Sequence, residues 1–205
     1  MMVLPPCLRL PLIFDAQALT AEINALGDAA WIPHFNTQYY AGDWSGIALR
    51  TPGGTISLYP DPHPTQAYAD TEHLAACPRM REALRALVAP ITSLRVLRLG
   101  PGAKVREHRD YQIGPEFGEV RVHVPLQTTA AAEFIVGGVA LEAAAGECWY
   151  VDVTQPHRVA NHGERARLHL VIDCVLDAWL KEVLESAARR SAGEGSSASV
   201  NAGYG

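Results

Sequence analysis

The chain has 205 residues, of which 48% are hydrophobic, and its formal net charge at pH 7 is -5. This length suffices for one hydrophobic core of ordinary size and leaves little room for a second, so we expect a single domain. The acidic balance, without any cluster of lysine and arginine, argues against a nucleic-acid partner.

The cysteines and the N-terminal segment bear on the compartment. The four cysteines are scattered and form no C-x-x-C pair, which favours reduced thiols over a disulfide framework or a structural zinc site. Residues 1–14 are apolar but carry three prolines and no basic residue before Arg9, unlike a signal peptide. No run approaches the length of a membrane span. We therefore expect a cytoplasmic protein without a membrane partner.

The first ninety residues predict helices and short strands. Asp15 is expected to cap a helix that runs to about Leu26, where Gly27 follows as a stop signal. Residues 31–58 combine aromatic side chains with turn signals and predict strands joined by loops. Trp44 and Tyr40 in this segment are candidates for a pocket wall, although an aromatic edge of the core is the simpler role. A second helix, with one polar face, is expected over residues 71–88.

After Pro90 the pattern changes to short strands separated by tight turns. Strands are expected at residues 93–99, 105–111, 119–127, 133–136, 139–142, 148–153 and 165–175. Such even spacing is typical of a β-sandwich or barrel. A helix at about 177–189 follows, and the Gly/Ser/Ala segment 191–205 is expected to be a flexible tail because it cannot bury enough apolar area.

A candidate metal site lies within this strand-rich part. His108 and Asp110 are two residues apart, so on an extended segment their side chains point to the same side. His157 supplies a second imidazole further along the chain. Two imidazoles and one carboxylate on one face of an ion leave the opposite face open, as a non-haem Fe(II) oxygenase requires. An H-x-D triplet also arises by chance, so it indicates metal binding only when the surrounding sequence supports it.

Two predicted strands direct basic side chains toward one interior. Alternation in residues 165–175 places Arg167 and His169 on one face of an apolar run, and Arg121 and His123 share a face of residues 119–127. A buried arginine requires an anionic partner, and its planar fork fits a carboxylate such as that of 2-oxoglutarate. For His123, a core histidine bonded to a backbone carbonyl is the competing interpretation.

An ordered set of motifs resembles the aspartyl/asparaginyl beta-hydroxylase family, which includes hydroxylases of free amino acids such as proline. The motifs occupy residues 108–110, 121–126, 146–152 and 157–170. The resemblance implies a mainly β fold, a double-stranded β-helix (a cupin-like jelly roll) with flanking α-helices. It implies one domain at 1–190 with a catalytic core at about 90–176. The chain keeps the acidic Asp110, which some family members lack, and so resembles the branch with a complete triad.

The resemblance also assigns the site. It implies iron bound by His108, Asp110 and His157, with 2-oxoglutarate held by Arg167 and with Arg121 and His123 nearby. The implied enzyme is a 2-oxoglutarate-dependent dioxygenase. With dioxygen it would hydroxylate an unactivated carbon of an amino acid or an aminoacyl residue (Asp, Asn or Pro type), releasing succinate and CO2. A peptide side chain, a free amino acid and a lipid acyl chain remain open as targets; the lack of a companion domain favours a small one.

Two other classes remain open. A cupin-like sensor would hold a metal or a small acid without turnover, because a fold does not establish a reaction. A zinc hydrolase can also use two histidines and an acid, but the sequence offers no separate general base to activate water. Arg167 discriminates among them, since a simple metal-binding cupin needs no buried clamp for a dicarboxylate.

Overall fold

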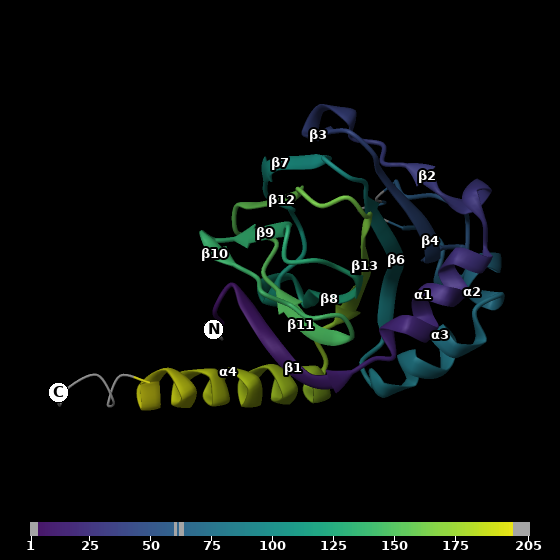
Figure 1. Ribbon diagram of the computed structural model, residues 1–205. Helices are drawn as coiled ribbons and strands as arrows, with labels where there is room; N and C mark the ends of the chain where they lie inside the picture. Colours follow the sequence, from purple (N-terminus) through teal and green to yellow (C-terminus); the bar gives the residue numbers. More distant parts are fainter. Residues whose placement is uncertain (1–3, 60, 62–63, 199–205) are drawn as a thin grey trace.

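Two antiparallel β-sheets enclose the interior of the molecule (Figure 1). The computed structural model describes residues 4–59, 61 and 64–198. The larger sheet has the order β1 (Cys7–Ile13), β11 (Glu147–Val151), β8 (Glu119–Gln127), β13 (Arg167–Val175), β6 (Ile91–Leu99), β4 (Trp44–Pro52) and β2 (Ile32–Pro33), with β5 (Tyr68–Asp70) beside β4. The smaller sheet has the order β10 (Val139–Ala140), β9 (Ala132–Val136), β12 (His157–Asn161), β7 (Lys104–His108) and β3 (Tyr40–Ala41).

The path of the chain identifies the architecture. From β6 onward, the chain passes to the smaller sheet for β7, returns for β8, and continues to alternate through β9 and β10, β11, β12 and β13. This winding between two facing sheets is that of a double-stranded β-helix or jelly roll. The expected mainly β, cupin-like fold with flanking helices is confirmed.

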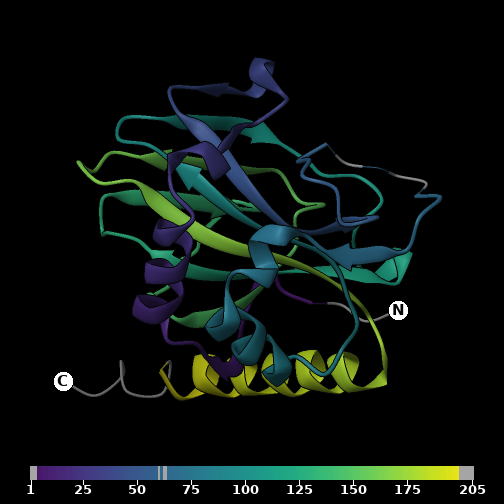
Figure 2. The ribbon, with the colours of Figure 1, turned by 90° about the vertical axis from the view of Figure 1, so that its right-hand side faces the viewer.

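The helices cover the outer face of the larger sheet (Figures 1 and 2). They are α1 (Ala16–Ala25), α2 (Glu72–Ala75), α3 (Pro78–Ala83) and α4 (Ala178–Ala198), with 3-10 turns at Asp28–Ala30, Thr37–Tyr39, Leu84–Ala86 and Pro115–Phe117. One main core cluster joins them to the sheet and includes Ile23 of α1, Val122 of β8, Ile172 of β13 and Leu184 of α4. Because side chains alternate along a strand, the other face of β8 and β13 looks into the interior.

Two helices differ from their predicted extents. Asp15 caps α1 as expected, its Oδ1 accepting a hydrogen bond from the Ala18 backbone at 3.0 Å. The single helix expected at 71–88 is instead α2, α3 and a 3-10 turn. Pro78 separates the two α-helices because proline has no N–H to donate within a helix and favours a first-turn position.

The C-terminal helix is longer than expected. Instead of ending near residue 189, α4 continues to Ala198, so part of the segment 191–205 that was expected to be flexible is helical. Each residue added to an existing helix gains a hydrogen bond without a new nucleation cost, which favours extension of a helix once it has formed. Residues 199–205 lie outside the described part of the chain. Among the described helices, none combines the length and apolarity needed to cross a membrane.

Asn161, the last residue of β12, fixes a corner of the jelly roll. Its side chain is 1% exposed, and its Nδ2 donates to the carbonyls of Leu99 at 2.9 Å and Arg165 at 2.8 Å. Asn161→Ala would leave these buried carbonyls unsatisfied. We expect the free energy of unfolding to fall by about 1–3 kcal/mol, measured by urea unfolding. The matched variant Asn24→Ala, on the exposed side of α1, should change it by less than about 0.5 kcal/mol. Equal losses in both variants would contradict this role.

Candidate metal centre and active-site cavity

A cavity of 610 Å³ lies between the two sheets. Inward-facing residues of β6, β8 and β13 form one wall, and residues of β7, β9 and β12 form the other. The cavity contains all six site residues that the sequence predicts, His108, Asp110, Arg121, His123, His157 and Arg167. These residues come from four strands and one loop, so the winding of the chain brings them together.

The three predicted metal ligands converge at one end of β7 and β12. His108 and His157 pair directly in the strand register, with ring centroids 4.2 Å apart. Asp110 follows β7 by two residues, and the nearest ligand atoms of the three side chains all lie within 4.8 Å of one another. Two imidazole nitrogens and a carboxylate oxygen in this arrangement fit an Fe(II) ion and leave one side of it open.

Backbone carbonyls orient both histidines for metal binding. Nδ1 of His108 lies 2.8 Å from the Arg106 carbonyl, and Nδ1 of His157 lies 3.0 Å from the Gln155 carbonyl. A carbonyl can only accept, so each Nδ1 donates a proton and each Nε2 keeps its lone pair for a metal. Burial and the neighbouring His108 lower the pKa of His157, which keeps this imidazole neutral at pH 7.

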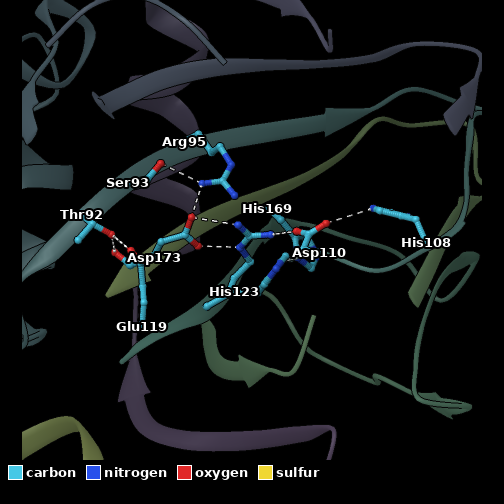
Figure 3. Close-up of polar contacts among 10 residues, drawn as sticks. Thr92, Ser93, Arg95, His108, Asp110, Glu119, His123, His169 and Asp173 are labelled. Carbon is cyan, nitrogen blue, oxygen red and sulfur yellow. Dashed lines mark hydrogen bonds and ion pairs between the residues drawn. The ribbon is translucent and has the colours of Figure 1, made fainter. Parts of the chain in front are cut away.

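Asp110 belongs to a buried network of alternating charges (Figure 3). Arg121 donates to Asp110 through Nη1 and to Asp173 through Nε, at 2.6 Å, and Nη2, at 3.0 Å. Arg95 donates to the same Asp173 at 2.9 Å. Burial opposes ionisation of Asp110, but Arg121 and the two histidines hold the pKa of this carboxyl below its usual value. The network therefore keeps Asp110 ionised and fixes its direction.

Arg121 was predicted to lie near a co-substrate. In the structure its guanidinium bridges Asp110 and Asp173, so its first contacts are carboxylates of this chain. Any contact with a co-substrate stays a prediction. Sequence reasoning missed Asp173, although the alternation that placed Arg167 and His169 on the inner face of β13 continues to this residue.

Asp173 stabilises the network through its charge. Burial opposes its ionisation, yet Arg121 and Arg95 hold its pKa far below the usual value. Asp173→Asn would leave two buried guanidinium groups poorly paired, and we expect a loss of about 3–5 kcal/mol in the free energy of unfolding at pH 7. A lowered carboxyl pKa stabilises the fold above the unfolded-state pKa of about 3.9, and this contribution is lost at lower pH. The difference in the free energy of unfolding between native protein and Asp173→Asn, measured by urea titration, should become smaller below about pH 4.

The matched control for Asp173 is a surface pair. Asp70→Asn removes the partner of Arg50, where the Asp70 side chain is 43% exposed. This variant should lower the free energy of unfolding by less than about 1 kcal/mol. Two results would show that the charge of Asp173 does not stabilise the interior. One is a loss below about 1 kcal/mol in the free energy of unfolding for both variants. The other is a difference in this free energy between native protein and Asp173→Asn that does not change with pH.

Arg167 is a buried cation in need of an anion. It is 7% exposed and forms no ion pair with any carboxylate of the described residues. Its Nη2 lies 3.1 Å from Nδ1 of His169, and its guanidinium carbon lies 5.2 Å from the centre of the Phe134 ring. Burial lowers the pKa of Arg167 to about 9, so the group remains charged at pH 7. A site of this kind can bind a carboxylate in bidentate fashion.

His123 offers an unused acceptor beside Arg167. A guanidinium can only donate, so Nδ1 of His169 accepts the hydrogen bond from Arg167. The same Nδ1 of His169 lies 3.4 Å from Nδ1 of His123, which must therefore carry a proton and donate it. Nε2 of His123 is then a lone pair, buried and without a hydrogen-bond partner among the described residues. Burial is the main cause that lowers the pKa of His123 well below its ordinary value, and the positive charges of nearby arginines add to this shift. His123 is therefore neutral, and no backbone carbonyl satisfies it.

Aromatic residues line the cavity near the triad. His34 stacks between Trp44, with centroids 3.5 Å apart, and Phe35, at 4.5 Å. Tyr39 approaches His108 at 5.6 Å. Of the two predicted pocket candidates, Trp44 lines the cavity, whereas Tyr40 packs edge-on against Trp44 behind it. Periodicity gave no signal for His34 and Phe35, because they lie in a loop that only tertiary contacts place.

Known structures share this fold. The protein is similar to an oxidoreductase of the 2OG-Fe(II) oxygenase family from Burkholderia pseudomallei, with a TM-score of 0.52 and 17% identity over 82% of this chain and 85% of that one. It is also similar to a Pseudomonas putida prolyl-4-hydroxylase, with a TM-score of 0.50 and 18% identity over 84% and 94% of the two chains. The non-heme alpha-ketoglutarate-dependent epimerase SnoN from nogalamycin biosynthesis gives a TM-score of 0.50 and 15% identity over 82% and 76%. At these identities the likeness concerns the fold.

The family follows from the sequence itself. The model of the family described as aspartyl/asparaginyl beta-hydroxylase matches residues 14–176. The matched region contains the metal triad, the charge network and Arg167. The resemblance drawn from the motifs is thus confirmed, and the chain belongs to the aspartyl/asparaginyl beta-hydroxylase family, as an oxygenase of the hydroxylase type.

Proposed function

We propose that the protein uses Fe(II), 2-oxoglutarate and dioxygen to hydroxylate an unactivated carbon of a small amino acid or of an aminoacyl residue of the Asp, Asn or Pro type. The observation that carries this proposal is a buried arginine, Arg167, which has no carboxylate partner among the described residues and lies in the same cavity as a His-Asp-His triad. A cupin that binds only a metal has no use for such a second, anion-binding group in its metal pocket.

The reaction balances with these reactants. 2-Oxoglutarate loses CO2 and becomes succinate, one oxygen atom of O2 enters succinate, and the other enters the new hydroxyl group. Bound Fe(II) would supply the activation of dioxygen, which no side chain can provide.

The side chains of this protein would bind and orient the reactants. His108, Asp110 and His157 would hold the metal and leave one side of it for the co-substrate and dioxygen. Arg167 would bind the far carboxylate of 2-oxoglutarate, which neutralises its buried charge. His123 accepts rather than donates at Nε2, so its contact with the co-substrate would run through a water that donates to this nitrogen.

The test is succinate formation by protein reconstituted with Fe(II) under anaerobic conditions and then given 2-oxoglutarate and air. Free amino acids and short peptides containing Asp, Asn or Pro are screened as substrates. We expect one class to stimulate succinate formation, and Asp110→Ala to remove the stimulation. Metal-dependent binding of 2-oxoglutarate without any turnover would favour the metal- or small-acid-binding sensor. If 2-oxoglutarate does not bind at all, the proposed function is wrong.

A further inference from the structure

A second arginine, Arg95, projects into the cavity from β6 and is not a metal ligand. It pairs with Val171 in the register of β6 and β13, and Val171 pairs with His123 on the other side. Arg167 lies four residues before Val171 on β13, which is roughly 13 Å of strand. Arg95 and Arg167, two of the five arginines that line the cavity, therefore lie on separate rows of the same sheet wall.

The hydrogen bonds of Arg95 use only part of its guanidinium. Nη1 donates to Ser93 at 3.0 Å and to Asp173 at 2.9 Å (Figure 3). Nε and Nη2 donate to no residue that the structure describes, although the side chain is only 17% exposed. Neither atom is among the buried polar atoms that lack a partner, so both N–H groups are accessible from the cavity. The unused edge of the fork has the geometry that accepts a carboxylate.

Asp173 does not neutralise Arg95 fully. It accepts two hydrogen bonds from Arg121 and one from Arg95, so one carboxylate serves two guanidinium groups. The other carboxylate of the network, Asp110, pairs with Arg121 and belongs to the metal triad. Arg95 thus shares Asp173 with Arg121 and keeps one N–H edge free for an incoming anion, and Asp173 and Arg121 link it to Asp110 of the predicted metal triad.

The aromatic residues of the cavity indicate which kind of group the rest of the ligand would have. The rings of Phe35 and Tyr59 are tilted against each other with centroids 4.6 Å apart, and Phe35 stacks on His34. Phe35 is 38% exposed and Tyr59 is 72% exposed, so apolar ring surface remains open beside the cavity. Both rings line the same cavity as Arg95. An apolar body fits this wall.

We propose that Arg95 binds the carboxylate of the primary substrate through its Nε and Nη2, and that this substrate is a small carboxylic acid with an apolar body lying against Phe35 and Tyr59. This inference rests on the proposed function, because it assigns Arg167 to the co-substrate and Arg95 to the molecule that is hydroxylated. Arg95 is then a specificity-determining residue: it selects acids over amides, esters and internal residues of a peptide that lack a free carboxylate.

The experiment compares acids with their amides. Protein loaded with Fe(II) and 2-oxoglutarate under anaerobic conditions is titrated calorimetrically with free amino acids and with the corresponding carboxamides. A charge-assisted hydrogen-bond pair predicts that the preferred acid binds about 10- to 100-fold more tightly than its amide. Arg95→Gln should reduce this preference to less than about threefold, and Arg95→Lys, which keeps the charge but not the fork, should give an intermediate value.

Two controls separate the possible failures. Arg98→Gln changes another arginine of β6 that lines the cavity but pairs with Asp43, and it should keep the acid preference. Binding of 2-oxoglutarate is measured first in every variant and should change by less than about threefold, which also reports folding. The inference is overturned if Arg95→Gln retains the acid preference, or if no acid binds more tightly than its amide to native protein that does bind 2-oxoglutarate. Failure of native protein to bind 2-oxoglutarate would instead overturn the proposed function.

Discussion

His157→Ala will remove metal-dependent turnover and weaken Fe(II) binding. The imidazole of His157 is 5% exposed and directs its Nε2 toward the same point as His108 and Asp110, so no other described side chain can replace it there. Loss of one ligand from a centre that contributes several kcal/mol to the reaction predicts a fall in kcat of at least about 100- to 1000-fold. Succinate formation and Fe(II) affinity, measured by anaerobic titration, should fall together.

The control is a histidine outside the triad. His162 follows β12 and is exposed, and it takes no part in the metal cluster. His162→Ala should keep turnover and Fe(II) affinity within about twofold of the native values. If His157→Ala keeps Fe(II) affinity while His162→Ala loses it, the triad has been assigned to the wrong residues.

Arg167→Leu will weaken 2-oxoglutarate binding strongly and leave the unliganded fold no less stable. Loss of a buried, charged hydrogen-bond pair costs about 2–5 kcal/mol, which is about a 30- to 3000-fold rise in the Kd of 2-oxoglutarate. In the absence of ligand, however, the variant removes a buried cation that has no carboxylate partner among the described residues. Leucine of similar volume should therefore keep or raise the Tm. Calorimetry and thermal unfolding without co-substrate measure the two effects.

This pair of results distinguishes a binding residue from a structural one. A structural arginine would lose stability and affinity together, whereas an anion-binding arginine loses affinity alone. Arg158→Leu supplies the comparison, since Arg158 is 46% exposed and pairs with surface glutamates of the smaller sheet. It should leave 2-oxoglutarate affinity within about twofold. Unchanged affinity in Arg167→Leu would show that the co-substrate carboxylate binds elsewhere.

The charge network explains how two separate functions share one interior. Asp173 joins Arg121, which orients Asp110 of the predicted metal triad, to Arg95, which we assign to the substrate. A ligand on Arg95 would alter the field at Asp110 through these contacts, because interactions among buried charges are weakly screened. Substrate binding and the metal centre would thereby be connected through side chains of β6, β8 and β13.

The sequence by itself determined which side chains face the interior of two strands. Alternation along residues 119–127 and 165–175 placed Arg121, His123, Arg167 and His169 on the inner faces, and the structure has them there. His108 and Asp110 converge as expected, although β7 ends at His108 and Asp110 lies in the loop that follows. The inferences about the two strands hold because side-chain direction in a strand depends only on position along the strand.

The sequence also indicated the family, but it placed some helix ends wrongly. Propensity favoured one helix at 71–88 and an early end to the last helix, and the structure has a break at Pro78 and an α4 that reaches Ala198. Helix ends depend on proline positions, on capping and on contacts with the sheet, and local patterns weigh these poorly.

Only the tertiary structure decided which groups meet. His108 and His157 become neighbours through the pairing of β7 with β12, and no local pattern fixes that register. Only the pairing of the strands shows that Arg121 bridges Asp110 and Asp173. It also shows that, within the part of the chain that the structure describes, Arg95 has an unused edge and Arg167 has no carboxylate partner. Whether a buried charge is paired depends on groups brought near it from distant parts of the chain. The pairing of charges therefore distinguishes side chains that bind one another from side chains that remain free to bind a ligand.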